Sequence, residues 1–557
     1  MQADSRKIIS ENIVADRSKL KIICVFLHRI YFGRIPYERQ YRGKKRKAMN
    51  ITELQQSYAS HPNVEGVCRL LKDNSVRHLY CGGLYASAAS LFSSVLVQRA
   101  TCPLVFILGD MEEAGYFYHD LTQILGTEQV LFFPSSFRRA IKYGQKDAAN
   151  EILRTEVLSR LQKGEEGLCV VTYPDALAEK VVSRKELGEN TLKLHAGERV
   201  DMNFVTDVLR SYGFEYVDYV YEPGQYAVRG SIIDVFSFSS EYPFRIDFFG
   251  DEVESVRTFE VETQLSKEKK ESIVIVPDLS HSLEKKGSGG MVSFLDFLPS
   301  DSLLAMRDFL WLRERIQTVH DESLTPQAIA ARESEENGAI TLEGKLIDGG
   351  EFTLRALDFR RMEFGNKPTG TPDATISFHT TVQPIFHKNF DMVAESFREY
   401  LSRHYTIYIC SDSLKQTDRI RAIFEDRGDN ISFTAVERTL HEGFADDTLR
   451  ICVFTDHQLF DRFHKYNLKS DKARSGKVAL SLKELNQFTP GDYVVHTDHG
   501  VGRFAGLVRI PNGDTTQEVM KIVYQNEDVV FVSIHSLHKV SKYKGKEGEA
   551  PRLNKLG

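Results

Sequence analysis

Residues 222–264 read EPGQYAVRGSIIDVFSFSSEYPFRIDFFGDEVESVRTFEVETQ, and their apolar residues recur with a period of two. This is the period of a β-strand, whose side chains point alternately to opposite faces. In the strand expected at 244–249, one face is predicted to be buried and carries Phe244, Ile246 and Phe248. The other face is predicted to be exposed and carries Arg245, Asp247 and Phe249. Turn-forming residues at 239–243 and 250–252 flank this strand. The stretch therefore predicts a small antiparallel sheet.

Arginines surround Phe249 on the predicted exposed face. Arg229 lies in the preceding apolar run, 226–236, and Arg257 lies in the following one. Arginine and aromatic residues are the types that protein interfaces concentrate as anchors. The alternative is that Phe249 packs under a loop and the arginines are merely solvated, because isolated exposed apolar residues are common. The pattern alone leaves both interpretations open.

A resemblance favours the interface. The strings AVRGSIIDVF and PFRIDFFGDEVESVRTF are closely similar to domain 2 of UvrB and of the transcription-repair coupling factor family. In that family this domain docks on UvrA. The residues that match the family's UvrA-contacting positions are Arg229, Arg245 and Phe249. The resemblance thus implies a UvrA-binding face made of residues that the alternation places at or near the surface.

The composition is that of an ordinary globular protein. The chain has 557 residues, and at roughly 150 residues per domain this suggests three or four domains. Its formal net charge of −6 argues against a chain that coats nucleic acid along its whole length. The 7 cysteines are scattered without a CxxC pair, which fits a reducing cytoplasm and no zinc module. No run approaches the roughly 18–20 apolar residues of a membrane helix, so no membrane association is expected.

Changes in pattern along the chain predict seven segments. They are a disordered N-terminal extension (1–48), a UvrB-like α/β domain 1A (49–190), a mostly antiparallel domain 2 (191–277), a segment that completes the first domain (278–370), a small α/β domain (371–461), a Lys-rich linker (462–486) and a C-terminal small β-barrel (487–557). The expected fold class is multidomain α/β and α+β, with a degenerate RecA-like (UvrB-like) first domain and an SH3/Tudor-like C-terminal barrel. That domain 2 is an insertion into the first domain is implied by the resemblance and not by the sequence pattern.

The first domain places a loop where a nucleotide site would be expected. The strand predicted at 78–81 leads into GGLYASAAS, residues 82–90, and then into a helix. A phosphate-binding loop at this place would read GxxxxGK[ST]. Counted from the second glycine, alanines replace the required glycine and lysine, and only the final serine fits: Gly83, Ala88, Ala89 and Ser90. Without the lysine nothing in the loop brings a positive charge to the β- and γ-phosphates, so we expect no nucleotide to bind.

The acidic residues after the next predicted strand have two interpretations. Residues 105–113 read VFILGDMEE, an apolar strand that ends in acidic residues. Such a strand can hold magnesium in a nucleotide site. Here the strand comes directly after the first helix, which is too early in the order of strands and helices for a magnesium-binding strand. The phosphate-binding loop that would accompany it is also missing. We therefore expect Asp110 and Glu113 to begin a helix, where negative charge is favourable.

The small α/β domain at 371–461 shows no grouping of a nucleophile, a base or metal ligands in its sequence. Helices are predicted at 390–403 and 414–426, and strands at 405–410, 431–436 and 449–455. Its histidines, among them His441 and His457, are too dispersed along the sequence to indicate a ligand set. No metal site is predicted.

The C-terminal segment predicts short strands at 493–496, 501–510, 518–524 and 529–534, separated by turn signals, which is typical of a small barrel. His496 and His499 could suggest a metal, but a tight corner between strand and turn explains them better. The string GDYVVHTDHGVGRFAG resembles the RNA polymerase-interacting domain of the same family, shared with CarD-type regulators.

That resemblance implies an exposed strand that adds to the sheet of the RNA polymerase β subunit. The matching strand is 518–524, and the candidate contact residues are Met520 and Ile522. The pattern leaves open that both are core residues.

Together these features predict the N-terminal half of a transcription-repair coupling factor, ending before its motor. The resemblance implies two recruitment surfaces, for UvrA and RNA polymerase, without catalysis or cofactors in these residues. It further implies that ATP, Mg²⁺ and double-stranded DNA bind to the ATP-driven translocase of the full-length protein. The alternative is a UvrB-like ATPase that opens damaged DNA, which would need a lysine in place of Ala89. A general DNA-binding protein is a third interpretation, which the acidic net charge weakens.

Overall fold

The computed structural model describes a large part of the chain. The described residues are 48–136, 148–261, 263–279, 291–324, 344–462, 466, 489–496, 499–512, 515–533, 540–543, 551 and 553–555. Nearly all of the predicted extension at 1–48 and most of the predicted linker at 462–486 lie outside them. In the described part of the chain, no helix is long and apolar enough to cross a membrane.

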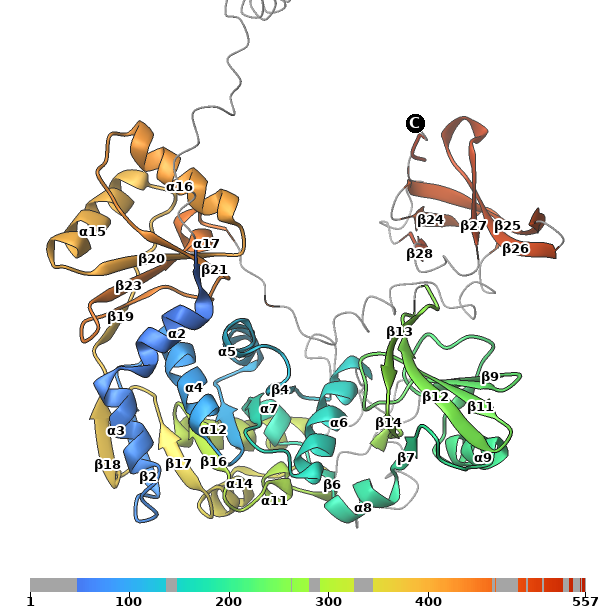
Figure 1. Ribbon diagram of the computed structural model, residues 1–557, viewed down its shortest axis with the longest axis horizontal. Coiled ribbons are helices and arrows are strands. Elements are labelled where there is room, and N and C mark those ends of the chain that lie inside the picture. The colour runs from blue at the N-terminus through green and yellow to red at the C-terminus, as the bar shows by residue number, and fades with distance from the viewer. Residues whose placement is uncertain are drawn as a thin grey trace, which may run out of the picture. The chain divides into compact units, whose positions relative to one another are not determined.

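A seven-stranded sheet with entirely parallel neighbours forms the first part of the fold, in the order β18-β2-β17-β16-β3-β5-β4. Its strands are β2 (His78–Gly82), β3 (Leu104–Ile107), β4 (Val130–Phe133), β5 (Cys169–Thr172), β16 (Leu303–Met306), β17 (Arg360–Glu363) and β18 (Ala374–Ser377). The chain leaves this sheet after β5 and returns at β16 (Figure 1). The antiparallel sheet built from the opening stretch is therefore an insertion between two strands of the parallel sheet.

Helices accompany the parallel strands and share one apolar core with them. They are α2 (Ile51–Ala59), α3 (Pro62–Leu70), α4 (Ser87–Arg99), α5 (Met111–Leu125), α6 (Ala148–Lys163), α12 (Phe309–Ser323) and α14 (Gly349–Ala356). The prediction that the acidic residues after β3 begin a helix is confirmed. Asp110 is the N-cap of α5, and its Oδ1 accepts hydrogen bonds from the backbone N–H groups of Glu112 (2.9 Å) and Glu113 (3.0 Å).

The inserted part holds a six-stranded sheet in the order β13-β12-β11-β10-β9-β8. Its strands are β8 (Glu215–Tyr216), β9 (Gln225–Arg229), β10 (Ile232–Val235), β11 (Phe244–Phe249), β12 (Glu252–Phe259) and β13 (Ser266–Lys270), with helix α9 (Met202–Ser211) ahead of them. The antiparallel pairing of β10 with β11 and of β11 with β12 confirms both predicted hairpins. The insertion begins and ends on one two-stranded sheet, because β7 (Leu192–His195) pairs with β14 (Ser272–Ile275).

A third, mixed sheet follows, in the order β1-β21-β20-β23-β22-β19. It consists of β1 (Met49–Asn50), β19 (Thr380–Val382), β20 (Thr406–Ser411), β21 (Thr434–Glu437), β22 (Phe444–Asp446) and β23 (Ile451–Thr455). Helices α15 (Phe390–Ser402) and α16 (Leu414–Asp426) bury their apolar faces in a core of their own with this sheet. The predicted helices and strands of this region are confirmed to within a few residues.

The last sheet is antiparallel and has five strands in the order β27-β26-β25-β24-β28. Its strands are β24 (Tyr493–His496), β25 (Gly500–Asn512), β26 (Thr515–Val523), β27 (Val529–Ser533) and β28 (Val540–Lys542). Short elements elsewhere are β6 (Val181–Val182), β15 (Met291–Val292), α7 (Pro174–Leu177), α8 (Arg184–Glu189), α11 (Phe294–Phe297), α17 (Asp456–Leu459) and the 3₁₀ turn η2 (Gln525–Glu527). The prediction of a mixed α/β chain with parallel and antiparallel sheets is confirmed.

Candidate functional site

The exposed face of the inserted sheet carries the residues that the alternation singled out. Phe244, Ile246 and Phe248 are buried in the core of the insertion, as predicted. Phe249 is 80% exposed at the end of β11, directly before the tight turn at Gly250. This exposure excludes the alternative that Phe249 packs under a loop. A phenylalanine this exposed is costly in water and is suited to insertion into a partner.

The two predicted arginines on this face share one carboxylate. Asp234 on β10 is fully buried, and its Oδ1 and Oδ2 accept hydrogen bonds from Arg245 Nε (2.7 Å) and Nη2 (2.9 Å). Arg229 Nη2 donates to the same Oδ2. A second ion pair on this face joins Arg257 Nη2 to Asp247 Oδ2 at 3.1 Å. Asp234 was not predicted as a site residue, although the single carboxylate inside the apolar run IIDVF was a usable signal.

The degenerate nucleotide loop follows β2 as predicted, and it is closed against the backbone of a later segment. Gly83 has φ of +76°, and a Cβ atom there would lie 2.1 Å from the carbonyl oxygen of Phe378. Thr380 Oγ1 donates to the carbonyl oxygen of Gly83 (2.7 Å) and accepts from the backbone N–H of Tyr85 (3.0 Å). The loop is therefore packed against the 378–380 segment.

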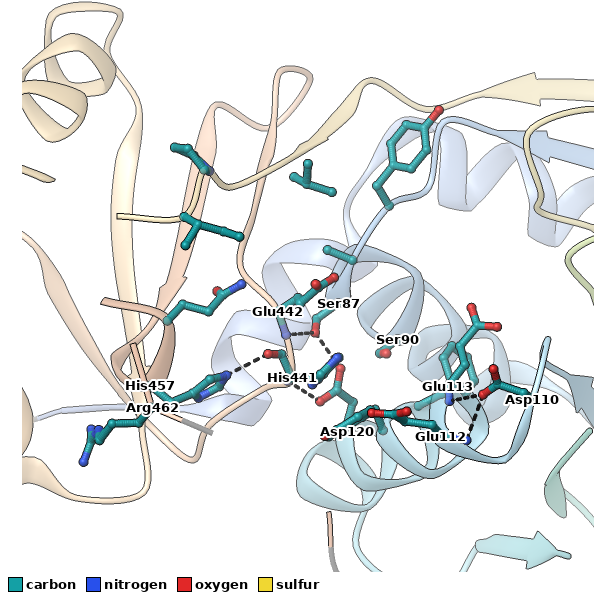
Figure 2. A pocket seen from close by; sticks show the side chains of 18 of the residues that line it. Ser87, Ser90, Asp110, Glu112, Glu113, Asp120, His441, Glu442, His457 and Arg462 are labelled. Carbon is teal, nitrogen blue, oxygen red and sulfur yellow. Dashed lines mark hydrogen bonds between the residues drawn. The ribbon is translucent and has the colours of Figure 1, made fainter. Parts of the chain in front are cut away.

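The N-terminus of α4, where a bound phosphate would be expected, is satisfied by groups of the protein itself. Figure 2 shows Ser87 and Asp120 facing the segment that carries His441 and Glu442. Ser87 Oγ donates to Asp120 Oδ2 (2.6 Å) and accepts from the backbone N–H of Glu442 (3.0 Å). The backbone N–H of His441 donates to Asp120 Oδ1 (2.7 Å). A carboxylate thus stands beside the first turn of α4 and links α4, α5 and the 441–442 segment.

Burial dominates the chemistry of this carboxylate. Asp120 is shielded from solvent, and this burial raises the pKa of its carboxyl to about 7, although hydrogen bonds from Ser87, His441 and Ser90 lower the pKa. The nearby Glu442 carboxylate also raises it. Ala88, Ala89 and Ser90 are all buried within α4. None of these groups offers the positive charge that a nucleotide phosphate needs.

A cavity of about 750 Å³ opens beside this contact. Several carboxylates line it, whereas its guanidinium groups come from Arg307 and Arg462. The lining carboxylates are Asp110, Glu112, Glu113, Asp120, Glu442 and Asp461. An excess of negative charge disfavours the binding of a phosphate group. Within the described residues, no group of three or more His, Cys, Asp and Glu side chains could hold a metal ion.

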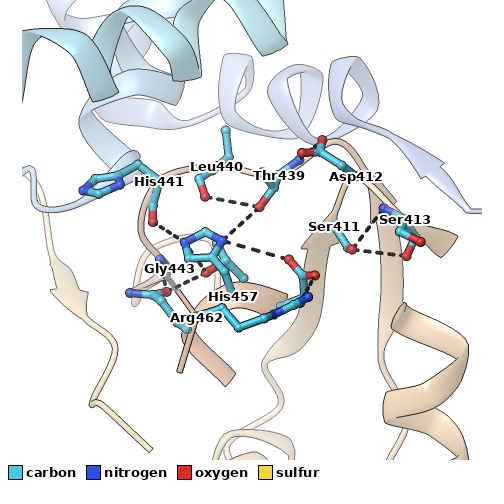
Figure 3. A network of polar contacts seen from close by, with 12 residues as sticks. Ser411, Asp412, Ser413, Thr439, Leu440, His441, Gly443, His457 and Arg462 are labelled. Carbon is cyan, nitrogen blue, oxygen red and sulfur yellow. Dashed lines mark hydrogen bonds and ion pairs between the residues drawn. The ribbon is translucent and has the colours of Figure 1, made fainter. Parts of the chain in front are cut away.

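The structure brings together two histidines that looked dispersed in the sequence. His457 Nε2 lies 2.8 Å from the carbonyl oxygen of His441, and its Nδ1 lies 3.4 Å from Thr439 Oγ1 (Figure 3). The ring of His441 stacks on that of Tyr116 from α5, with centroids 3.6 Å apart. The two histidines meet because the carboxyl ends of β21 and β23 lie at the same edge of the third sheet, which their spacing in the sequence did not indicate. Their contacts hold the 441–442 segment against α5.

The C-terminal sheet requires a correction. The strand predicted to be exposed for a partner corresponds to β26, but β26 is hydrogen-bonded to β25 on one side and to β27 on the other. Met520 and Ile522 are both 0% exposed and belong to the core of this sheet. They are core residues, the alternative that the sequence left open. A strand paired on both sides has no free backbone groups for addition of another strand.

Among the described strands, the neighbouring β27 lies at the edge of this sheet. Its Phe531 is 49% exposed, and Val529 is also exposed, whereas Val532 is buried. The alternation of inward and outward side chains along β27 leaves an apolar outer face beside a free edge. His496 and His499 lie close together, with ring centroids 4.7 Å apart.

Comparisons with known proteins match two of these regions. A family model described as the UvrB interaction domain matches residues 192–281, which contain the whole inserted sheet. A model described as the CarD-like/TRCF RID domain matches residues 488–544, which contain the C-terminal sheet.

Relatives resemble the chain over much more of its length. A transcription-repair-coupling factor of Staphylococcus aureus (strain bovine RF122 / ET3-1) is 24% identical over 539 residues, covering 85% of this chain and 46% of the relative. The transcription-repair-coupling factor of Bacillus subtilis (strain 168) is 22% identical over 553 residues, with the same coverage. The chain spans about half the length of the curated relatives it matches. It is therefore similar to transcription-repair-coupling factors over most of its length, with a UvrB interaction domain in its middle and a CarD-like/TRCF RID domain after it.

Proposed function

We propose that this chain is a recruitment scaffold of transcription-coupled nucleotide excision repair, and that its inserted sheet binds UvrA. The observation that carries the proposal is Phe249, which is 80% exposed beside a row of ion-paired arginines. This face belongs to the segment that matches the UvrB interaction domain. An exposed aromatic ring next to arginines has the composition of an interface hot spot. Arg229, Arg245 and Phe249 remain the proposed UvrA-binding residues.

We propose that the second partner is the β subunit of RNA polymerase, bound by the C-terminal sheet. Support comes from the match to the CarD-like/TRCF RID domain and from the free edge of β27. An edge strand can accept a strand of the partner through backbone hydrogen bonds, while outward side chains such as Phe531 supply specificity. The proposed contact strand is therefore β27 and not β26.

We further propose that these residues bind no ATP and catalyse no reaction, and that any ATP- and Mg²⁺-dependent translocation on DNA depends on other residues of a longer protein. The rival proposal is a UvrB-like ATPase. Alanine at positions 88 and 89, and the Asp120 carboxylate beside the first turn of α4, argue against the rival.

UvrA binding is tested by substituting Phe249 and comparing it with a matched control. Phe204 on α9 is also more than half exposed and lies in the same matched segment, so F204A makes the same chemical change elsewhere. We expect F249A to weaken UvrA binding about thirtyfold, the cost of truncating an interface anchor, while F204A changes it by less than about threefold. Titration calorimetry with purified UvrA measures both affinities.

Equal affinities of F249A and the unsubstituted protein would contradict the proposed docking face. Absence of UvrA binding by the unsubstituted protein would contradict the proposed function itself.

A further inference from the structure

The cavity beside the 441–442 segment has exposed apolar side chains at its mouth. Tyr85, in the loop after β2, is 40% exposed, and Val382 and Ile385, at the end of β19 and just after it, are 60% and 68% exposed. These three residues, here called the apolar mouth, line the same cavity of about 750 Å³. Exposed apolar residues that gather around one hollow are typical of a binding surface, whereas single ones are not. The apolar mouth belongs neither to the inserted sheet nor to the C-terminal sheet.

The edge strand β19 presents an extended backbone at this mouth. Among the described strands, β19 lies at one edge of the third sheet and pairs with β22. The backbone N–H of Gln383 donates to the carbonyl oxygen of Gly443, on the side of β22, whereas that of Thr380 donates to Gly83 on the opposite side. Because successive residues of a strand direct their backbone groups to opposite sides, those of Val382 point away from β22. An extended segment of a partner can therefore lie along this edge.

The guanidinium groups that line the cavity are already paired within the protein. Arg307 Nε lies 2.6 Å from Glu113 Oε1, and Arg462 Nη2 lies 2.6 Å from Asp456 Oδ2. They therefore do not neutralise the other carboxylates of the cavity.

Two of those carboxylates lack a cationic partner among the described residues. Glu112 is exposed in the first turn of α5, and Glu442 is partly buried on the opposite wall (Figure 2). The hydrogen bonds of both residues with other described residues involve their backbone groups, and neither side chain forms an ion pair there. Burial raises the pKa of the Glu442 carboxyl, although Arg307 lowers it, so the negative charge of Glu442 is incompletely compensated. An ammonium or guanidinium group in the cavity would supply the missing charge.

We propose that this cavity docks an extended, basic segment of a partner protein, which places apolar side chains on the apolar mouth and a lysine or arginine opposite Glu112 and Glu442. A segment with alternating apolar and basic residues satisfies both parts of the site. A small free cation would satisfy the carboxylates alone, and an acidic segment would be repelled by them. The proposed docking surface is separate from the surfaces proposed for UvrA and RNA polymerase, so its test does not depend on theirs.

A probe peptide tests the docking on the whole chain. The probe is Gly-Val-Lys-Val-Arg-Val-Gly, capped at both ends and labelled with an uncharged fluorophore, and the control peptide has glutamate in place of its two basic residues. Fluorescence anisotropy measures both affinities. We expect the basic peptide to bind about tenfold more tightly or better, and to bind more weakly at high salt, because the paired charges are partly exposed. Equal binding of the two peptides, or no binding of the basic peptide up to about 1 mM, would overturn the proposal.

Matched substitutions at surface positions locate the docking surface. E442Q removes one carboxylate from the cavity, whereas E395Q removes an exposed carboxylate from α15. I385A truncates the apolar mouth, whereas L354A truncates an equally large side chain that is 71% exposed on α14. We expect E442Q and I385A each to weaken binding of the basic peptide about tenfold, and each control to weaken it less than about twofold. Effects of equal size in the variants and their controls would overturn the proposed location.

The methyl signal of Ile385 reports docking without any substitution in the measured protein. In protein labelled at the isoleucine δ1 methyl groups, this NMR signal is identified by its absence from I385A. We expect the basic peptide to shift the signal, and putrescine, which carries two positive charges without the apolar side chains, to displace the peptide only weakly. Peptide-induced shifts confined to other isoleucines would overturn the location. Putrescine that competes as well as the unlabelled peptide would identify a simple cation site and overturn the docking of a protein segment.

Discussion

Among single residues, Asp120 shows most directly how contacts of the protein itself fill the space beside the start of α4. Its carboxylate accepts hydrogen bonds from Ser87 and from the backbone of His441, next to the first turn of α4. The first turn of a helix attracts anions, because its backbone N–H groups lack partners within the helix. Here the backbone N–H groups of Ser87, Ala88 and Ala89 donate to carbonyl oxygens of the protein, and the Asp120 carboxylate lies beside them, bound by the Ser87 hydroxyl.

The raised pKa of Asp120 predicts how stability depends on pH. The pKa of its carboxyl is about 7 in the folded protein, compared with the ordinary 3.8. The folded state therefore keeps a proton that the unfolded state releases between these values. The stabilising contribution is complete below the ordinary pKa and is lost as the pH rises through about 7. Glu442, whose pKa burial also raises, acts in the same direction.

We expect D120N to remove this dependence. Asparagine has the same shape and cannot ionise. As the pH rises from 5 to 7, the free energy of unfolding of D120N minus that of the unsubstituted protein should therefore increase by on the order of 1 kcal/mol per pH unit. Urea unfolding monitored by fluorescence at several pH values measures the difference. Glu442 is present in both proteins, so the effect of its own burial is the same in both. Parallel pH profiles of the two proteins would show that Asp120 does not titrate in this range.

Sequence patterns located Phe249 but not the buried carboxylates Asp234 and Asp120. The period of two in 244–249 was sufficient to place Phe249 outside, because a strand has only two faces. Asp234 and Asp120 could not be assigned in the same way, because a carboxylate within an apolar run has no partner until distant strands or helices are brought together. Asp120 meets His441 only through the packing of the third sheet beside α5.

Among the secondary-structure elements, β26 and β27 show that predicting where a strand lies in the sequence differs from predicting whether it lies at the edge of its sheet. The positions of all four predicted strands in the C-terminal sheet were found from alternation and turn signals. The order of these strands across the sheet could not be predicted, because alternation does not reveal which strands are neighbours. Among the described strands, β27 and β28 lie at the two edges of this sheet, so β27, and not its neighbour β26, has an unpaired side.

Substitutions on the two strands should therefore have opposite effects. F531A removes an exposed ring from β27, and we expect it to weaken binding to the RNA polymerase β subunit about tenfold with little loss of stability. M520A creates a cavity in the core and should lower the free energy of unfolding by about 2–5 kcal/mol while the folded protein still binds. Surface plasmon resonance and thermal unfolding separate the two.

If folded M520A lost polymerase binding and F531A kept it, the assignment of the contact to β27 would be wrong.

In the whole molecule, we propose that the loop at 83–90, the acidic cavity and the 441–442 segment together disfavour nucleotide binding. We expect no ATP hydrolysis and no thermal stabilisation by ATP with Mg²⁺. Restoring the missing residues with A88G/A89K should not create an ATP site, because the Asp120 carboxylate still lies beside the first turn of α4 and carboxylates line the nearby cavity. A coupled ATPase assay and differential scanning fluorimetry check both proteins. Hydrolysis by the unsubstituted protein that S90A abolishes would favour the rival ATPase.

The order of strands in the parallel sheet has a consequence for biosynthesis. β2 leaves the ribosome early, yet both of its neighbours, β17 and β18, are translated only after the whole inserted sheet has been made. The insertion has its own core, and its paired strands are mainly close in sequence. It can therefore fold before the neighbours of β2 have been translated. The growing chain must therefore carry an apolar strand without partners through much of translation, and this strand is where a chaperone would be needed.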